Sequence, residues 1–84
     1  PSIDPATLRL LAACWRREDS IILPRCGASA GHPVTFPARF GEELMTLHGD
    51  RGARRVLDAH EHEIYEFITD DRGVLYDVDT PADL

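Results

Sequence analysis

The chain contains no lysine, and this absence excludes two kinds of chemistry. All nine of its basic residues are arginines. A phosphate-binding loop built around a lysine is therefore excluded, as is a Schiff-base mechanism within this chain. The 15 acidic residues give a formal net charge of −6 at pH 7. This balance argues against nucleic acid as a partner, because nucleic acids bind to concentrated basic surfaces. Phosphate groups would have to be held by arginine, by helix N-termini or by a divalent cation.

Long apolar segments and cysteines are also scarce. No segment approaches the ~20 apolar residues of a membrane span, and no basic, apolar targeting segment opens the chain. Cys14 and Cys26 are too few for a disulfide framework, so we expect a reduced, cytoplasmic compartment and no membrane partner. A length of 84 residues predicts one small domain with a modest core.

The first half of the chain predicts one helix and two strands. Asp4 is expected to cap a helix that begins at Pro5, since Asp accepts backbone N–H bonds and Pro suits the first helical position. Apolar residues follow at helical spacing, and the expected buried stripe consists of Leu8, Leu11, Ala12 and Trp15. The apolar run at 21–23 predicts a buried strand, residues 25–31 a mobile loop, and residues 32–36 an edge strand.

The second half predicts two helices and two further strands. Pro37 and Asp50 are expected to begin the helices. Their inward side chains should be Phe40, Leu44 and Leu47 in the first, and Ala53, Val56 and Leu57 in the second. Residues 64–68 predict a strand that a tight hairpin joins to another at 74–78, with a crossing between sheet layers left open. The order of elements indicates an α/β layer structure.

Two carboxylates follow the last expected strand. Asp77 and Asp79 are two residues apart, so on a strand both project from one face. Thr80 and Pro81 then suit the cap and first position of a helix. Carboxylates at the carboxyl end of an α/β strand lie where such folds bind ligands. The alternatives are that Asp77 accepts backbone N–H bonds at a turn and that Asp79 caps the helix.

Three motifs occur in the order and spacing of one protein family. They are Gly-His-Pro-Val at 31–34, Gly-Asp-Arg-Gly-Ala-Arg at 49–54 and Asp-Val-Asp-Thr-Pro-Ala-Asp-Leu at 77–84. With them the chain resembles the C-terminal half of the MobA-like nucleotidyltransferases, specifically the molybdenum cofactor cytidylyltransferase branch. The resemblance covers residues 1–84 and implies a single α/β domain. This would be the acceptor-binding half of a Rossmann-like nucleotidyltransferase sheet with helices packed on it, without the nucleotide-binding half.

The resemblance also implies a reaction and its ligands. Family members transfer CMP from CTP, or GMP from GTP in a sister branch, to the phosphate of the molybdopterin cofactor, using Mg²⁺. Nucleotide, pterin cofactor and Mg²⁺ are therefore the implied ligands. The glycine-rich loop that grips the triphosphate belongs to the absent half. We thus expect the chain to be inactive alone, and we assign no catalytic residue to it.

The resemblance implies that Asp77 and Asp79 bind the metal. A physical argument points the same way, because a triphosphate facing bare carboxylates is repelled by about 4 kcal/mol per charge pair at 4 Å and an effective dielectric of ~20. A divalent cation converts this repulsion into attraction.

Substrate contacts are implied for His32, Gly31 and Arg54. His32 would contact the phosphate or pterin of the acceptor, with Gly31 allowing the backbone to approach the ligand. The alternative is a structural histidine that closes the loop. Arg54, in the first turn of its helix, would meet a substrate phosphate or pair with Asp50.

Two histidines and one cysteine are not assigned to a metal or catalytic site. His60 and His62 lack a third ligand in register for zinc, so a solvated corner between helix and strand is expected there. Cys26 has only Arg25 beside it to lower its pKa and is taken as incidental.

Two hypotheses for the whole chain remain. The first is a piece of a cofactor cytidylyltransferase, with an exposed apolar face where the missing half or another copy docks. The second is a non-catalytic, self-associating interaction domain that retains the fold only, in which Mg²⁺ and CTP change nothing.

Overall fold

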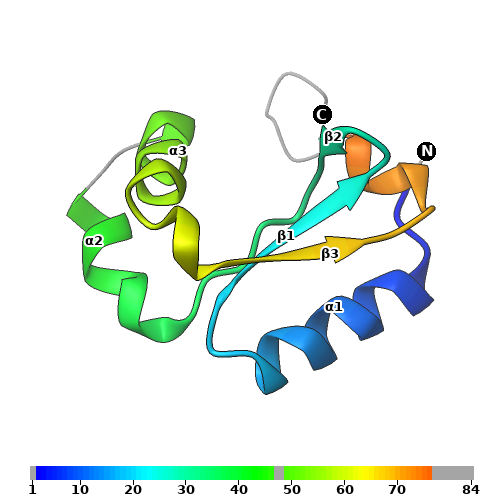
Figure 1. The fold of residues 1–84 in the computed structure, drawn as a ribbon, viewed down its shortest axis with the longest axis horizontal. Helices are drawn as coiled ribbons and strands as arrows, with labels where there is room; N and C mark the ends of the chain where they lie inside the picture. Colours follow the sequence, from blue (N-terminus) through cyan, green and yellow to red (C-terminus); the bar gives the residue numbers. More distant parts are fainter. Residues whose placement is uncertain (1, 47–48, 77–84) are drawn as a thin grey trace.

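The computed structural model describes residues 2–46 and 49–76, with the backbone alone at 49–51. Helix α1 (Pro5–Arg17) comes first, followed by strands β1 (Ile21–Cys26) and β2 (Ser29–Ala30). The 3₁₀ turn η1 (Ala38–Phe40) and helices α2 (Gly41–Thr46) and α3 (Gly49–Ala59) follow. The 3₁₀ turn η2 (Glu61–Glu63), strand β3 (Ile64–Ile68) and the 3₁₀ turn η3 (Arg72–Leu75) end the described chain (Figure 1). These elements form a small α/β fold, as the sequence predicted, and their sheet is mixed and has three strands.

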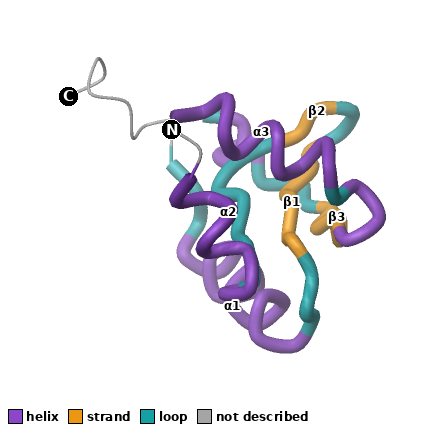
Figure 2. Tube along the Cα trace, turned by 90° about the vertical axis from the view of Figure 1, so that its left-hand side faces the viewer, coloured by secondary structure: helices purple, strands orange, loops and turns teal. Residues whose placement is uncertain are grey.

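The strand order of the sheet is β2-β1-β3, and helices lie on both of its faces (Figures 1 and 2). β1 pairs parallel to β3 from Ile21↔Ile64 to Arg25↔Ile68, and antiparallel to β2. Figures 1 and 2 both place α1 on the opposite side of the strands from α3. Because β1 has a helix on each side, its apolar run is buried on both faces: Ile22 packs with α1, and Ile21 packs with Val56 of α3.

Helix α1 begins as the sequence predicts but buries a different stripe. The Asp4 side chain accepts a hydrogen bond from the Ala6 N–H at 2.8 Å, and Pro5 takes the first position. The buried residues are Thr7, Leu11 and Cys14. Of the expected stripe only Leu11 is buried: Ala12 is exposed, as are Leu8 (43%) and Trp15 (42%). The Trp15 ring lies at the rim, because its indole Nε1 donates to the Phe36 carbonyl oxygen at 3.0 Å.

The segment expected to be a mobile loop at 25–31 is a β-hairpin. Arg25 pairs with Ala30 and Cys26 with Ser29, so only Gly27 and Ala28 form the turn. Gly27 has φ +63°, which a two-residue turn of the II′ type requires at its first central position. Gly27 is therefore explained by the backbone conformation of the hairpin turn.

Residues 32–36 do not form the expected edge strand. They make a single antiparallel bridge, in which the Ile22 N–H donates to the Thr35 carbonyl (2.9 Å) and the Thr35 N–H donates to the Ile22 carbonyl (3.1 Å). Pro33 and Pro37 flank this bridge and have no N–H to extend a ladder.

The two expected helices after Pro37 are present. Pro37 caps η1, which continues into α2, and α3 begins at Gly49, one residue before the expected cap Asp50. Phe40 and Val56 are buried against Ile21, whereas Leu47 lies outside the described residues. None of the described helices is long and apolar enough to cross a membrane.

The strand expected at 64–68 is present as β3, whereas the described segment after it differs from the prediction. β3 has the expected bounds, but the hairpin to a strand at 74–78 is wrong, because β3 pairs in parallel with β1 and Arg72–Leu75 forms η3. Val74 is fully buried within this turn. Asp77, Asp79, Thr80 and Pro81 lie outside the described residues.

Candidate functional site

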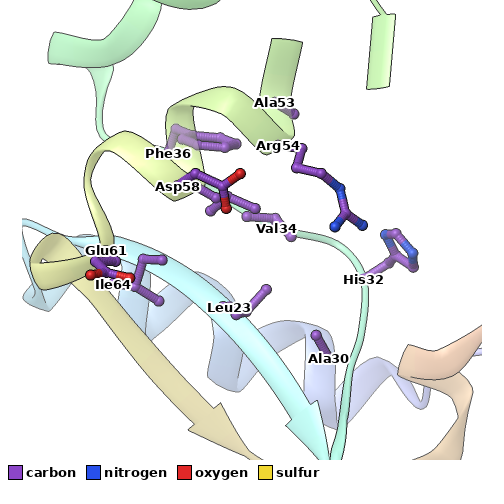
Figure 3. A pocket seen from close by; sticks show the side chains of 11 residues that line it. Leu23, Ala30, His32, Val34, Phe36, Ala53, Arg54, Asp58, Glu61 and Ile64 are labelled. Carbon is purple, nitrogen blue, oxygen red and sulfur yellow. The ribbon is translucent and has the colours of Figure 1, made fainter. Parts of the chain in front are cut away.

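A cleft of about 690 Å³ lies between α3 and the face of the sheet opposite α1 (Figure 3). Residues from the strands, the 31–37 connection, α3 and η2 line it: Leu23, Ala30, His32, Val34, Phe36, Ala53, Arg54, Leu57, Asp58, Glu61 and Ile64. Its volume falls within the ~300–1,000 Å³ of ordinary small-molecule sites. The cleft is therefore large enough for a ligand of nucleotide or cofactor-fragment size.

The structure brings His32 and Arg54 together in this cleft. They are 22 residues apart, one in the connection after β2 and the other on α3, and the Arg54 guanidinium points toward the His32 ring (Figure 3). Both side chains are exposed, so a ligand can reach them. An arginine and a histidine at one end of a cleft form a candidate site for an anionic group.

Gly31 lies beside the cleft, but a close contact behind it explains the absence of a side chain. A Cβ added at Gly31 would lie 2.5 Å from the Val74 carbonyl oxygen and 2.7 Å from Val74 Cγ2. The His32 N–H donates to the same carbonyl at 2.6 Å, and the Gly31 N–H donates to the Pro24 carbonyl at 2.8 Å. These contacts fix the backbone that carries His32. A ligand contact of Gly31 stays a prediction.

Two acidic residues of the cleft were not identified from the sequence. Asp58 lies one helical turn after Arg54, and Glu61 follows in η2. The helical spacing of Arg54 and Asp58 was a usable signal, because residues four apart share a helix face. Glu61 carries no comparable signal, since its place depends on the turn between α3 and β3.

The pair predicted to bind metal, Asp77 and Asp79, lies outside the described residues. Within 2–46 and 49–76, no group of three or more His, Cys, Asp and Glu side chains could hold a metal ion. Cys14 is a buried free thiol, and Cys26 is a half-buried free thiol at the end of β1.

His60 and His62 lie at the expected corner between α3 and β3, where His62 is exposed, but His60 is half-buried and forms part of an ion-pair network. Its Nε2 lies 3.0 Å from Glu43 Oε1, and its Nδ1 lies 3.0 Å from Glu63 Oε2. Its ring also packs edge-on against Phe40, with the ring centroids 4.9 Å apart. The hydrogen bond to Glu43, together with that to Glu63, raises the pKa of His60 above its usual 6.5, although partial burial opposes this. The network fastens α2 to the corner after α3.

Arg39 extends this network to the turn before β1. Its Nη2 lies 2.6 Å from Glu63 Oε1, and its Nη1 lies 2.9 Å from Asp19 Oδ1. The Arg39 hydrogen bond, with that of His60, lowers the pKa of Glu63. The side chains of these two ion pairs are between 40% and 87% exposed, so the pairs contribute modestly to stability.

Asp71 holds η3 against the start of α1. Its carboxylate accepts hydrogen bonds from the Asp4 N–H and the Gly73 N–H, both at 2.9 Å. The Thr7 hydroxyl, with these two amides, lowers the pKa of Asp71 below its usual value. Because η3 contains Val74, whose carbonyl binds the His32 N–H, Asp71 also supports the backbone of the cleft.

A family model described as "MobA-like NTP transferase domain" matches residues 1–64 of the chain. This range includes the hairpin, the 31–37 connection, α3 and all the residues that line the cleft. No curated protein and no solved structure matches the chain.

Proposed function

The chain belongs to the family of MobA-like NTP transferase domains, and from this premise we propose that it is the acceptor-binding part of a Mg²⁺-dependent cofactor nucleotidyltransferase. Membership of the family indicates nucleotidyltransferase activity in general. The reaction we propose is transfer of CMP from CTP, with GMP from GTP as the alternative, to the phosphate of molybdopterin. A cytoplasmic location goes with this proposal.

The observation that carries the proposal is the shared cleft of His32 and Arg54. The guanidinium supplies a fixed positive charge with planar donors, which suits a phosphate oxygen pair. The His32 ring adds a donor from the opposite wall. We assign this end of the cleft to the phosphate of the acceptor, with Gly31 supporting the His32 backbone.

The nucleotide triphosphate would be held elsewhere. The chain has no lysine for a phosphate-binding loop, and the described part has no three-residue metal site. We propose Asp77 and Asp79 as the Mg²⁺ ligands. When bound, Mg²⁺ would neutralise charge on the phosphates of the nucleotide. The residues of this chain that act in the cleft would bind and orient the acceptor.

Titration of the ¹⁵N-labelled chain with inorganic phosphate tests the cleft assignment. We expect shifts of the His32 and Arg54 amides, and weaker binding by about tenfold in Arg54→Gln, because a hydrogen bond to a charged group is lost. Arg55→Gln is the matched control: it removes the same charge from the next residue of α3, which does not line the cleft. Equal weakening by both variants would show a general charge effect and contradict the assignment.

A second titration, with Mg²⁺–CTP and Mg²⁺–GTP, tests the metal ligands. The proposal expects shifts at Asp77 and Asp79 that Asp77→Asn removes. Unchanged spectra at millimolar Mg²⁺–nucleotide would contradict a metal site in this chain.

A non-catalytic, self-associating domain is the second candidate function, and one observation favours it. Within the described residues β3 pairs only with β1, so its other edge is open. Beside it a groove of about 370 Å³ exposes apolar side chains, among them Leu10 (60%) and Ile68 (68%). Open edges with apolar surface favour association. Sedimentation equilibrium should then show dimers that Ile68→Asp dissociates, whereas a monomer at 100 µM would contradict this candidate.

A further inference from the structure

The charges of the cleft are separated along its length. In Figure 3 His32 and the Arg54 guanidinium lie at one end, and the carboxylates of Asp58 and Glu61 lie toward the other. The floor between the two ends is apolar, with Leu23 and Val34, and Ile64 lies beside Glu61. The cleft therefore offers a ligand donors at one end, an apolar surface in the middle and acceptors at the other end.

Arg54 and Asp58 do not neutralise each other. Their spacing of four residues would permit an ion pair on the helix surface. Among the side chains that the structure describes, however, neither Arg54 nor Asp58 forms an ion pair within 4.0 Å. The guanidinium points toward His32 instead (Figure 3). The side chains of Arg54 and Asp58 are both exposed, so a ligand can reach them.

We infer that the acidic end of the cleft selects the ligand, with one carboxylate, that of Asp58 or that of Glu61, accepting hydrogen bonds from two adjacent N–H groups of a flat heterocycle. An ionised carboxylate only accepts hydrogen bonds, so this end rejects ring edges that present oxygen or bare nitrogen. The edge with two adjacent donors is that of a 2-amino-4-oxopyrimidine ring, which pterin and guanine share. The ring face would lie on the apolar floor while the anionic group of the ligand meets Arg54. This inference rests on the proposed function, because it takes the Arg54 end as the phosphate end.

Two pairs of probes separate the amino group from the rest of the ligand. Lumazine-6-carboxylate has an oxo group in place of the 2-amino group of pterin-6-carboxylate, and IMP has a hydrogen in place of the 2-amino group of GMP. Each is titrated into the full chain, with binding followed by amide shifts and, for the pteridines, by fluorescence. We expect the amino member of the preferred pair to bind about tenfold more tightly, since its partner leaves a carboxylate without a donor. The pair that shows the preference distinguishes a pterin from a guanine ligand.

Variants assign the preference to the acidic end. Asp58→Asn or Glu61→Gln should reduce the tenfold preference to about twofold or less without weakening the binding of inorganic phosphate, since each change removes a negative charge from the cleft. Glu42→Gln is the matched control, because Glu42 is an exposed glutamate of α2 that does not line the cleft. Circular dichroism spectra of all variants should match that of the parent chain.

The outcomes separate this inference from the proposed function. Phosphate binding that depends on Arg54, without any preference for the amino probes, overturns the inference and leaves the phosphate end intact. A preference that survives in both Asp58→Asn and Glu61→Gln also overturns it. Loss of phosphate binding to the parent chain overturns the proposed function itself, and the inference with it.

Discussion

Replacing Gly31 by alanine would place a methyl group against the backbone of Val74. The added Cβ would lie 2.5 Å from the Val74 carbonyl oxygen and 3.0 Å from its carbonyl carbon, and Val74 is fully buried in η3. The Val74 backbone has little room to retreat, because its carbonyl also accepts the His32 N–H at 2.6 Å. Overpacking of this kind costs about 1–3 kcal/mol, and loss of the hydrogen bond adds about 1 kcal/mol. We therefore expect Gly31→Ala to lower the free energy of unfolding by about 2–4 kcal/mol.

Urea and thermal denaturation followed by circular dichroism measure this effect. A domain of this size is stable by about 4–13 kcal/mol, so the variant should fold unless the parent chain lies at the lower end of this range, and its thermal midpoint should be lower by roughly 8–32 °C. Gly41→Ala is the matched control: no atom lies within 4 Å of its Cβ, and it begins α2 with helical φ and ψ, so the change should stabilise by about 0.5–1 kcal/mol. Gly27→Ala also meets no atom, but its φ of +63° should cost about 1–2 kcal/mol.

The result at Gly31 decides between two roles for this glycine. A loss of less than about 0.5 kcal/mol would refute the packing argument, because that is the usual range of surface substitutions. If such a stable variant bound inorganic phosphate less tightly, close approach of a ligand to the backbone would explain the glycine at position 31 better than packing against Val74 does. A large loss of stability makes Gly31 a structural support for His32.

Three further predictions concern the packing around the cleft. Glu43 is the main cause of the raised pKa of His60, and the protonated ring stabilises the fold below about pH 6.5. This contribution is lost as the pH rises through the pKa of the folded state. The free energy of unfolding should therefore fall from pH 6 to 8, and His60→Gln should make this fall smaller. The lowered pKa of Asp71 makes stability depend on pH in the opposite direction: its contribution is present above about pH 4 and is lost on acidification. Asp71→Asn should therefore lower the urea midpoint at pH 7, and the urea midpoints of variant and parent chain should converge in acid. Val56→Ala should cost about 1–3 kcal/mol in urea denaturation, because Val56 is fully buried between Ile21 and Phe40.

Local sequence signals predicted where the helices and strands lie better than which segments pair with each other. The cap at Asp4 and the run at 64–68 each act through neighbouring residues, and both were placed correctly. The pairing of β3 was wrong, because a parallel pair with β1 joins segments about 40 residues apart, whereas a hairpin is the locally shortest choice. Val74 looked like the start of a strand because it is apolar. It is buried instead in a turn that the Asp71 side chain closes.

The candidate site shows the same division between local and distant information. His32 and Arg54 were identified separately, each from a motif, and only the fold brings them to one end of a cleft. Asp58 was missed because its charge suits an exposed helix face as well as a binding site. Whether it lines the cleft depends on which face α3 turns toward the sheet. Val56 packs on Ile21 from one side of α3, whereas Arg54 and Asp58, two residues before and after it, lie on the opposite side of the helix, where they line the cleft. A substitution that rotates α3, rather than one that removes a charge, should therefore disturb both ends of the cleft at once.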